Sequence, residues 1–171
     1  PYVGPVLTAN GLIDVAYDLL MQQTFRFCLY PVKMGATTIW ERWDGQKTDS
    51  TVQDAGMNSF NHYAYGAIGD WMYRVAAGIE IGAPGYKHIL IQPHPGTKFT
   101  YAKASFESSY GQIASGGEMK DGKLTVKGKV PAKTRATIIL PGAQTEKVKE
   151  TGVAVTTAFK SEKKETNKLM I

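Results

Sequence analysis

Residues 86–93 read YKHILIQP, and at this stretch the hydrophobic pattern of the chain changes from helical to extended. The apolar alternation within residues 87–91 predicts a β-strand. Pro93 should end that strand, because proline has no N–H to donate to a sheet. We therefore expect helices before this stretch, strands after it, and a break at residues 93–96.

The two regions also differ in composition. Residues 1–96 carry a net charge of −2 and hold all three Trp, all three His and thirteen of the eighteen aromatic residues. Residues 97–171 carry a net charge of +7. With 171 residues, of which 43% are hydrophobic, the chain is globular in composition and long enough for one or two domains.

Helical periodicity predicts two helices in the first region. The first should be capped by Thr8 or Asn10 and fade near residues 23–27. The second should span residues 58–77. Between them, residues 29–57 form a long loop without a clean period, and long ordered loops are often functional.

The second region predicts an antiparallel β-sandwich. Asp121-Gly122 suits the positive φ angles of a tight hairpin turn, and residues 169–171 could add a last strand. Several short strands separated by turns favour a sandwich. The strands are expected at residues 87–91, 99–108, 112–119, 123–130 and 136–140.

The loop contains GATTIWERWD, residues 35–44, which places Glu41 between Trp40 and Trp43. Indole rings raise the pKa of a neighbouring carboxylate and stack on sugar rings, whereas Arg42 would lower that pKa. The alternative is structural: both tryptophans pack in a core, and Glu41 pairs with Arg42 or a distant arginine.

A second segment, GMNSFNHYAYG at residues 56–66, gathers amide, imidazole and phenol groups at the start of the expected helix. Asn58 and His62 fall on roughly one side of it. The structural alternative is that Asn58 or Ser59 caps the helix and His62 is a core histidine with its hydrogen bonds satisfied.

Other chemistries find little support. The histidines have no carboxylate or cysteine at metal-ligand spacing, so we expect no metal and no cofactor. The lone Cys28 lies in an apolar context typical of buried, inert cysteines. The basic second region lacks interleaved aromatic residues, and no apolar run approaches the ~18 residues of a membrane span, so neither nucleic acid nor membrane is expected as a partner.

The two segments, together with Tyr30-Pro31-Val32 and Ala83–Lys87, closely resemble blocks of the bacterial α-L-rhamnosidases of glycoside hydrolase family 78. The resemblance covers about residues 5–96. It implies an α+β chain in which residues 1–85 are the last helices of an (α/α)6 catalytic barrel and residues 86–171 are a C-terminal antiparallel β-sandwich.

The resemblance also implies an activity: inverting hydrolysis of terminal α-L-rhamnosyl residues from glycosides. Glu41 matches the general base that activates water, and His62 matches a rhamnose-contacting residue. We expect Trp40, Trp43 and Asn58 to contact substrate beside it.

The resemblance implies that the general acid belongs to barrel helices upstream of Pro1. We therefore expect a fragment that is inactive alone and self-associates through its exposed barrel face. The alternative is a non-catalytic structural or carbohydrate-binding module. The implied partner is a rhamnose-containing glycoside or polysaccharide, and cytoplasmic, periplasmic and secreted locations all stay open.

Overall fold

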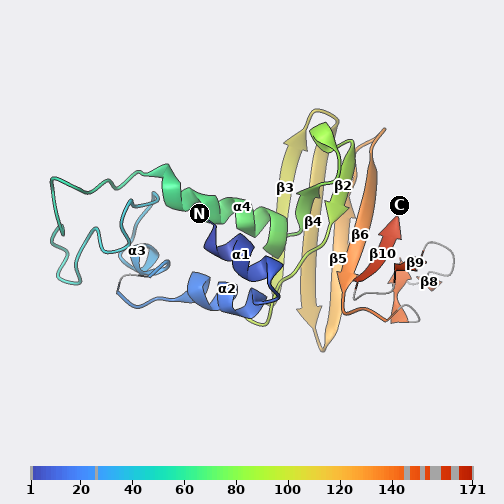
Figure 1. The fold of residues 1–171 in the computed structure, drawn as a ribbon, viewed down its shortest axis with the longest axis horizontal. Coiled ribbons are helices and arrows are strands. Elements are labelled where there is room, and N and C mark those ends of the chain that lie inside the picture. Colours follow the sequence, from blue (N-terminus) through green and yellow to red (C-terminus); the bar gives the residue numbers. More distant parts are fainter. Residues whose placement is uncertain are drawn as a thin grey trace. The chain divides into compact units, whose positions relative to one another are not determined.

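The chain folds into two compact units (Figure 1). The computed structural model describes residues 2–25, 27–144, 147–150, 153–154, 159–162 and 166–170. One unit comprises Pro1–Trp71 with Gly96–Lys98, and the other comprises Met72–Pro95 with Phe99–Ile171. The first unit is helical and the second holds the β-sheets, as the change of pattern predicted. The position of the break was predicted too late: the units divide at residues 71 and 72, and a first strand, Ile79–Ile81, precedes residues 86–93.

The first unit begins with two helices where the sequence pattern predicted one. Thr8 Oγ1 donates to Gly4 O (2.9 Å) and Asn10 Nδ2 donates to Val6 O (2.8 Å), so both side chains bond back to the first helix. The prediction that one of them caps the helix that follows, Ile13–Met21, was wrong. The helices of this unit are α1 (Val3–Ala9), α2 (Ile13–Met21), α3 (Tyr30–Lys33), the 3-10 turn η1 (Tyr63–Gly66) and α4 (Ala67–Trp71).

The side chain of Trp71 joins α4 to α1 and α2. It is 2% exposed, and its Nε1 donates to Thr8 Oγ1 at 2.9 Å. Its ring meets the fully buried Tyr17 edge-on, with 5.1 Å between centroids. A Cβ on Gly4 would lie 3.1 Å from the Trp71 ring, so glycine allows α1 to approach the indole closely.

The second predicted helix starts later than expected. Residues 58–62 are not helical, and the first helical turn is η1, beginning at Tyr63. The reason is non-local: the backbone of residues 59–62 is hydrogen-bonded to residues 39–41. After α4 the chain continues as a short π-helix, η2 (Met72–Ala76).

The second unit contains two main sheets. One has the strand order β1-β2-β6-β10-β9 and the other β3-β4-β5. The strands are β1 (Ile79–Ile81), β2 (His88–Ile91), β3 (Tyr101–Ser108), β4 (Gly111–Lys120), β5 (Lys123–Lys129), β6 (Arg135–Pro141), β9 (Phe159–Glu162) and β10 (Thr166–Met170); the 3-10 turn η3 (Pro84–Tyr86) precedes β2, and β7 (Lys149–Glu150) with β8 (Val153–Ala154) forms a separate ribbon.

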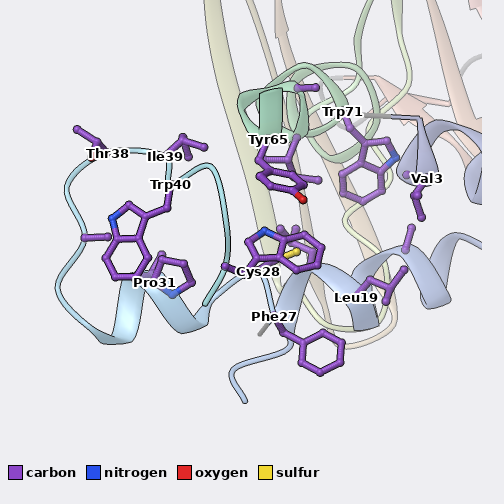
Figure 2. Close-up of a pocket in the computed structure, with 18 of the residues that line it drawn as sticks. Val3, Leu19, Phe27, Cys28, Pro31, Thr38, Ile39, Trp40, Tyr65 and Trp71 are labelled. Carbon is purple, nitrogen blue, oxygen red and sulfur yellow. The ribbon is translucent and has the colours of Figure 1, made fainter. Parts of the chain in front are cut away.

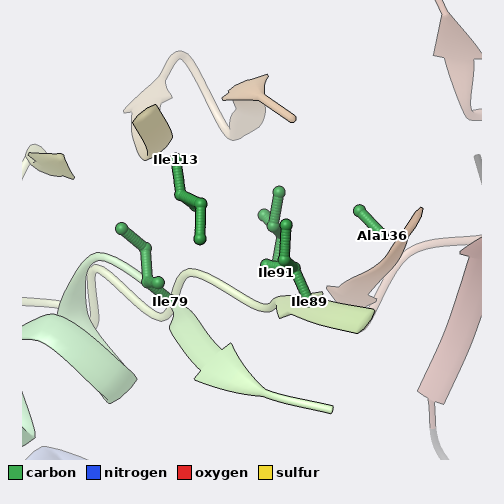
Figure 3. Packing of buried hydrophobic residues seen from close by; sticks show 5 residues of the cluster. All are labelled: Ile79, Ile89, Ile91, Ile113 and Ala136. Atoms are coloured by element: carbon green, nitrogen blue, oxygen red, sulfur yellow. The ribbon is translucent and has the colours of Figure 1, made fainter. Parts of the chain in front are cut away.

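The two main sheets pack face to face over an aliphatic core (Figure 3). Ile79, Ile89 and Ile91 come from β1 and β2, Ala136 comes from β6, and Ile113 comes from the opposite sheet. All five are at most 2% exposed. The predicted sandwich is therefore confirmed.

The strand predictions hold to within two residues for β2 to β6, and β10 confirms the expected last strand. Asp121 and Gly122 have φ of 51° and 70°, as the predicted hairpin turn requires. Two expectations were wrong. Strands β1, β7, β8 and β9 were not predicted, and β2 pairs with β6 in parallel, so the sandwich is not purely antiparallel.

We expect Gly78 to be the most sensitive glycine of the second unit. Its φ is +74°, and an added Cβ would lie 2.1 Å from the Pro93 nitrogen. Gly78→Ala should lower the free energy of unfolding by more than about 3 kcal/mol, because the backbone at Pro93 would have to move to make room for the methyl group. Gly122 has a similar φ of +70° with open space around it.

Gly122→Ala is therefore the matched control for backbone strain alone, and should cost about 1–2 kcal/mol. Urea unfolding followed by circular dichroism would measure both variants. Equal losses of stability would show that the approach of Pro93 to Gly78 contributes nothing.

Candidate functional site

The structure brings together the two segments that the sequence singled out. The N–H of Glu41 donates to Ser59 O, and the N–H of His62 donates to Ile39 O, both at 2.8 Å. Thr38 Oγ1 adds a bond to the carbonyl of residue 60. Two stretches about twenty residues apart therefore run side by side within the first unit, like a short antiparallel pair.

Glu41 differs from the other carboxylates of this loop. Asp44 is 8% exposed and accepts from Arg42 Nε at 3.1 Å. Asp49 accepts from the N–H and the hydroxyl of Thr51, and these hydrogen bonds hold its pKa below the usual range. Asp54 accepts from a backbone N–H two residues along.

The half-buried Glu41 forms no side-chain hydrogen bond or ion pair within the part of the chain that the structure describes. Arg42 is instead paired with Asp44. One part of the structural alternative, a pair between Glu41 and Arg42, was therefore wrong, whereas Trp40 is buried as that alternative expected. No other arginine among the described residues pairs with Glu41. A carboxylate without a local partner has all of its acceptor positions available to water or substrate.

His62 occupies the N-cap of η1. Its Nδ1 accepts from the Ala64 N–H at 3.3 Å, and its ring stacks on Tyr63 with 8° between the planes. Because Nδ1 accepts, the neutral ring carries its hydrogen on Nε2, which can donate to a ligand hydroxyl. The expected cap at Asn58 or Ser59 was wrong, since His62 takes that role.

Asn58 fixes the loop from inside. Its Nδ2 donates to Gly45 O at 2.8 Å, while its Oδ1 is buried without a hydrogen-bond partner among the described residues. A Cβ on Gly45 would lie 2.8 Å from that oxygen. The Asn58 side chain thus joins the two ends of the 45–58 lobe, and its role as a substrate contact stays a prediction.

Both tryptophans make aromatic contacts. Trp40 is 6% exposed and meets Phe60 edge-on at 5.1 Å between centroids. Trp43 lies against Tyr65 at 4.9 Å. Each pair joins the segment of residues 38–43 to the segment that follows residue 58, so packing of this kind supports the backbone that carries Glu41.

The same tryptophans line a cavity of about 510 Å³ in the first unit (Figure 2). Its lining is mainly apolar and comes from α1, α2, α3, η1, α4 and the loop residues between α2 and η1. Glu41 and His62 are not among the lining residues. A sugar needs hydrogen bonds for its hydroxyl groups, so this cavity suits apolar side chains better than a glycoside. Its larger members are Val3, Leu19, Leu20, Phe27, Val32, Ile39, Trp40, Trp43, Tyr65, Ile68 and Trp71.

This cavity was not predicted from the sequence. Its walls come from helices and a loop that are distant in the sequence, and α1 was not predicted as a helix. Cys28, expected to be buried and inert, is one of the lining residues, and burial raises the pKa of its thiol. The apolar run of residues 3–7 was the signal that could have revealed α1.

Neither a metal site nor a membrane span is found among the described residues. They contain no group of three or more His, Cys, Asp or Glu side chains that could hold a metal ion. No described helix has both the length and the apolar character needed to cross a membrane.

Two family models match the chain. The bacterial alpha-L-rhamnosidase 6 hairpin glycosidase domain matches residues 1–76, and the bacterial alpha-L-rhamnosidase C-terminal domain matches residues 78–155. Among curated proteins, an alpha-L-rhamnosidase of Streptomyces avermitilis is 43% identical over 88% of this chain. One of Formosa agariphila is 42% identical over 87%. The chain spans 15% and 16% of the length of these two relatives.

Solved structures agree with these matches. The alpha-L-rhamnosidase of Streptomyces avermitilis complexed with L-rhamnose superposes with a TM-score of 0.86 and 39% identity, over 98% of this chain and 16% of that one. The enzyme of Dictyoglumus thermophilum gives 0.83 and 31%, over 99% of this chain and 19% of that one.

The Cys28 thiol provides a test of the cavity. Because its pKa is raised by burial, less thiolate is present at pH 8 than in an unhindered cysteine. Alkylation by iodoacetamide should be about tenfold slower in the folded chain than in 6 M urea. The rate should rise as the pH increases toward the raised pKa. Equal rates in the folded and the unfolded chain, measured by mass spectrometry, would contradict a half-buried cysteine in this cavity.

Proposed function

The chain belongs to the bacterial alpha-L-rhamnosidase family, and from that membership we propose that it acts as part of an enzyme that hydrolyses terminal α-L-rhamnosyl residues of glycosides with inversion of configuration. Residues 1–85 would supply the end of the catalytic barrel and residues 86–171 the C-terminal sandwich. That boundary stays a prediction; the family models meet near residue 77.

The observation that carries the proposal is the carboxylate of Glu41, which has no partner among the described residues. In an inverting hydrolysis one carboxylate removes a proton from water as the water attacks the anomeric carbon. That carboxylate must be free to accept the proton and must be held in place. Glu41 meets both conditions, because its backbone N–H is bonded to Ser59 O and its side chain has no partner among the described residues.

His62 would bind the sugar in this scheme. Its Nε2–H is free to donate to a hydroxyl, while Nδ1 is occupied by the Ala64 N–H. The hydrogen bond from the His62 N–H to Ile39 O joins residue 62 to the stretch of backbone that carries Glu41, which supports a shared site. Trp40, Trp43 and Asn58 are proposed to contact the substrate beside His62.

A second carboxyl must protonate the leaving oxygen, at about 6.5–9.5 Å from the base. Within the loop, Asp44, Asp49 and Asp54 are already engaged by an arginine, a threonine and a backbone N–H. We propose that the acid comes from a part of the six-hairpin domain outside residues 1–76. The chain by itself would then bind weakly and turn nothing over.

The alternative function, a non-catalytic structural piece, is favoured by the apolar surface of the first unit, which includes the cavity and exposed residues beside it. Several apolar residues of α1 and α2 are exposed, among them Val6 (56%), Val15 (44%) and Leu19 (37%). Apolar surface of this kind marks a packing interface. We propose that other helices of the six-hairpin domain pack there, and that a second copy substitutes for them in the isolated chain.

Self-association of the isolated chain should therefore depend on the cavity. Leu19→Glu places a charge at its wall and should shift the chain toward monomer in size-exclusion chromatography with light scattering. Val52→Glu makes the same charge change at a residue that is 46% exposed and outside the cavity, and should have no effect. A chain that is monomeric at every concentration would refute this interface.

Glu41→Gln tests the catalytic role in a protein that carries the complete barrel. Glutamine keeps the shape and removes the basicity. The kcat on an aryl α-L-rhamnoside should fall by about 10²–10⁴-fold. KM should change little, because the lost interaction acts mainly in the transition state. Activity within about threefold of the parent would make Glu41 structural.

His62→Ala provides the comparison. Its hydrogen bond to a sugar hydroxyl would exist in the ground state too, so KM should rise as well. Arg42→Gln is the matched control for a neighbouring charge, since Arg42 contacts Asp44 and not Glu41. A large loss of kcat in that control would shift the explanation from Glu41 chemistry to loop geometry.

A further inference from the structure

The sheet of β3, β4 and β5 has an outer face that the proposed activity does not use. Alternation along β4 turns Ile113, Ser115 and Gly117 inward, where they are buried. The alternate positions of all three strands face away from the core. They are Tyr101, Lys103, Ser105 and Glu107 of β3, Gln112, Ala114, Gly116, Glu118 and Lys120 of β4, and Lys123, Thr125, Lys127 and Lys129 of β5.

The register places two lysines on either side of a glycine. Lys103 of β3 and Lys127 of β5 both pair with Gly116 of β4. In the next row Ala114 lies between Ser105 and Lys129. Neighbouring strands are about 4.8 Å apart, so the Cα atoms of Lys103 and Lys127 are roughly 10 Å apart, with small residues of β4 between them. We call Lys103, Lys127, Lys129, Ala114 and Gly116 the basic strip.

The charges around the strip are only partly balanced. Lys129 Nζ donates to Gln112 Oε1 (2.9 Å), and Gln112 in turn donates to Glu107 (2.8 Å). Lys103 and Lys127 are exposed and have no ion pair within the described residues. One carboxylate, Glu118, stands in the next row beside Tyr101, which is 62% exposed.

We propose that the basic strip binds a polysaccharide chain that carries carboxylate groups. The ammonium groups of Lys103 and Lys127 would bind successive carboxylates as point charges. The small residues of β4 let an extended chain approach the sheet, and the ring of Tyr101 offers a face for an apolar sugar face. The choice of a glycan over another polyanion rests on the proposed function.

Affinity electrophoresis of the whole chain in gels containing polygalacturonate, with neutral dextran as reference, tests the proposal. At low salt, polygalacturonate should retard the chain, and neutral dextran should not. The double variant Lys103→Gln/Lys127→Gln should bind about tenfold more weakly, because two exposed ion pairs are lost. Lys33→Gln/Lys47→Gln makes the same charge change on two exposed lysines of the first unit, one at the end of α3 and one in the loop, and should bind like the parent.

Glu118→Gln should strengthen retardation about threefold by removing the one acid of that row, a gain that misfolding does not produce. Three results would overturn the proposal: no retardation, equal losses in both lysine pairs, or equal affinity for single-stranded DNA. The readout is binding and not turnover, so failure here leaves the role of Glu41 untouched. Conversely, if the Glu41→Gln enzyme stays active, the proposed catalytic role fails but the predicted binding to the basic strip is unaffected.

Discussion

Two main-chain hydrogen bonds, from the N–H of Glu41 to Ser59 and from the N–H of His62 to Ile39, hold the long loop on which the proposed site depends. A loop of nearly thirty residues carries many backbone donors and acceptors that burial would otherwise leave unsatisfied. The loop satisfies several of them internally. Tyr30 Oη donates to Gln46 O and Asn58 Nδ2 donates to Gly45 O, so side chains also satisfy backbone carbonyls of the loop.

The strand half of the fold was predictable because its signals are local. Alternation and the Asp121-Gly122 turn act over a few residues, and they located β2 to β6 closely. The helical half depends on distant partners. Residues 58–62 have a helical pattern, but their pairing with residues 39–41 keeps them out of a helix. The parallel pairing of β2 with β6 likewise joins residues almost fifty apart, and nothing local indicates it.

The candidate site divides in the same way. Composition alone suggested a carboxylate among aromatic rings, and the family resemblance selected Glu41 and His62. What the sequence left open was the partner of each charged group. Only the geometry shows that Arg42 is bound to Asp44, and that His62 caps η1 through Nδ1. Those contacts depend on side-chain direction within a loop, for which one sequence has no periodic signal.

Assembly and catalysis would be coupled through the tryptophans. Trp40 and Trp43 line the apolar cavity and flank Glu41 in the sequence. Helices that fill the cavity would bury both rings further, at about 25 cal/mol for each Å² of apolar surface removed from water. Because the rings anchor the backbone on both sides of Glu41, the same packing would restrict the motion of the proposed base. In the proposed scheme, the packing that brings the general acid to the site would therefore also hold Glu41 in place, and catalysis would require the complete barrel.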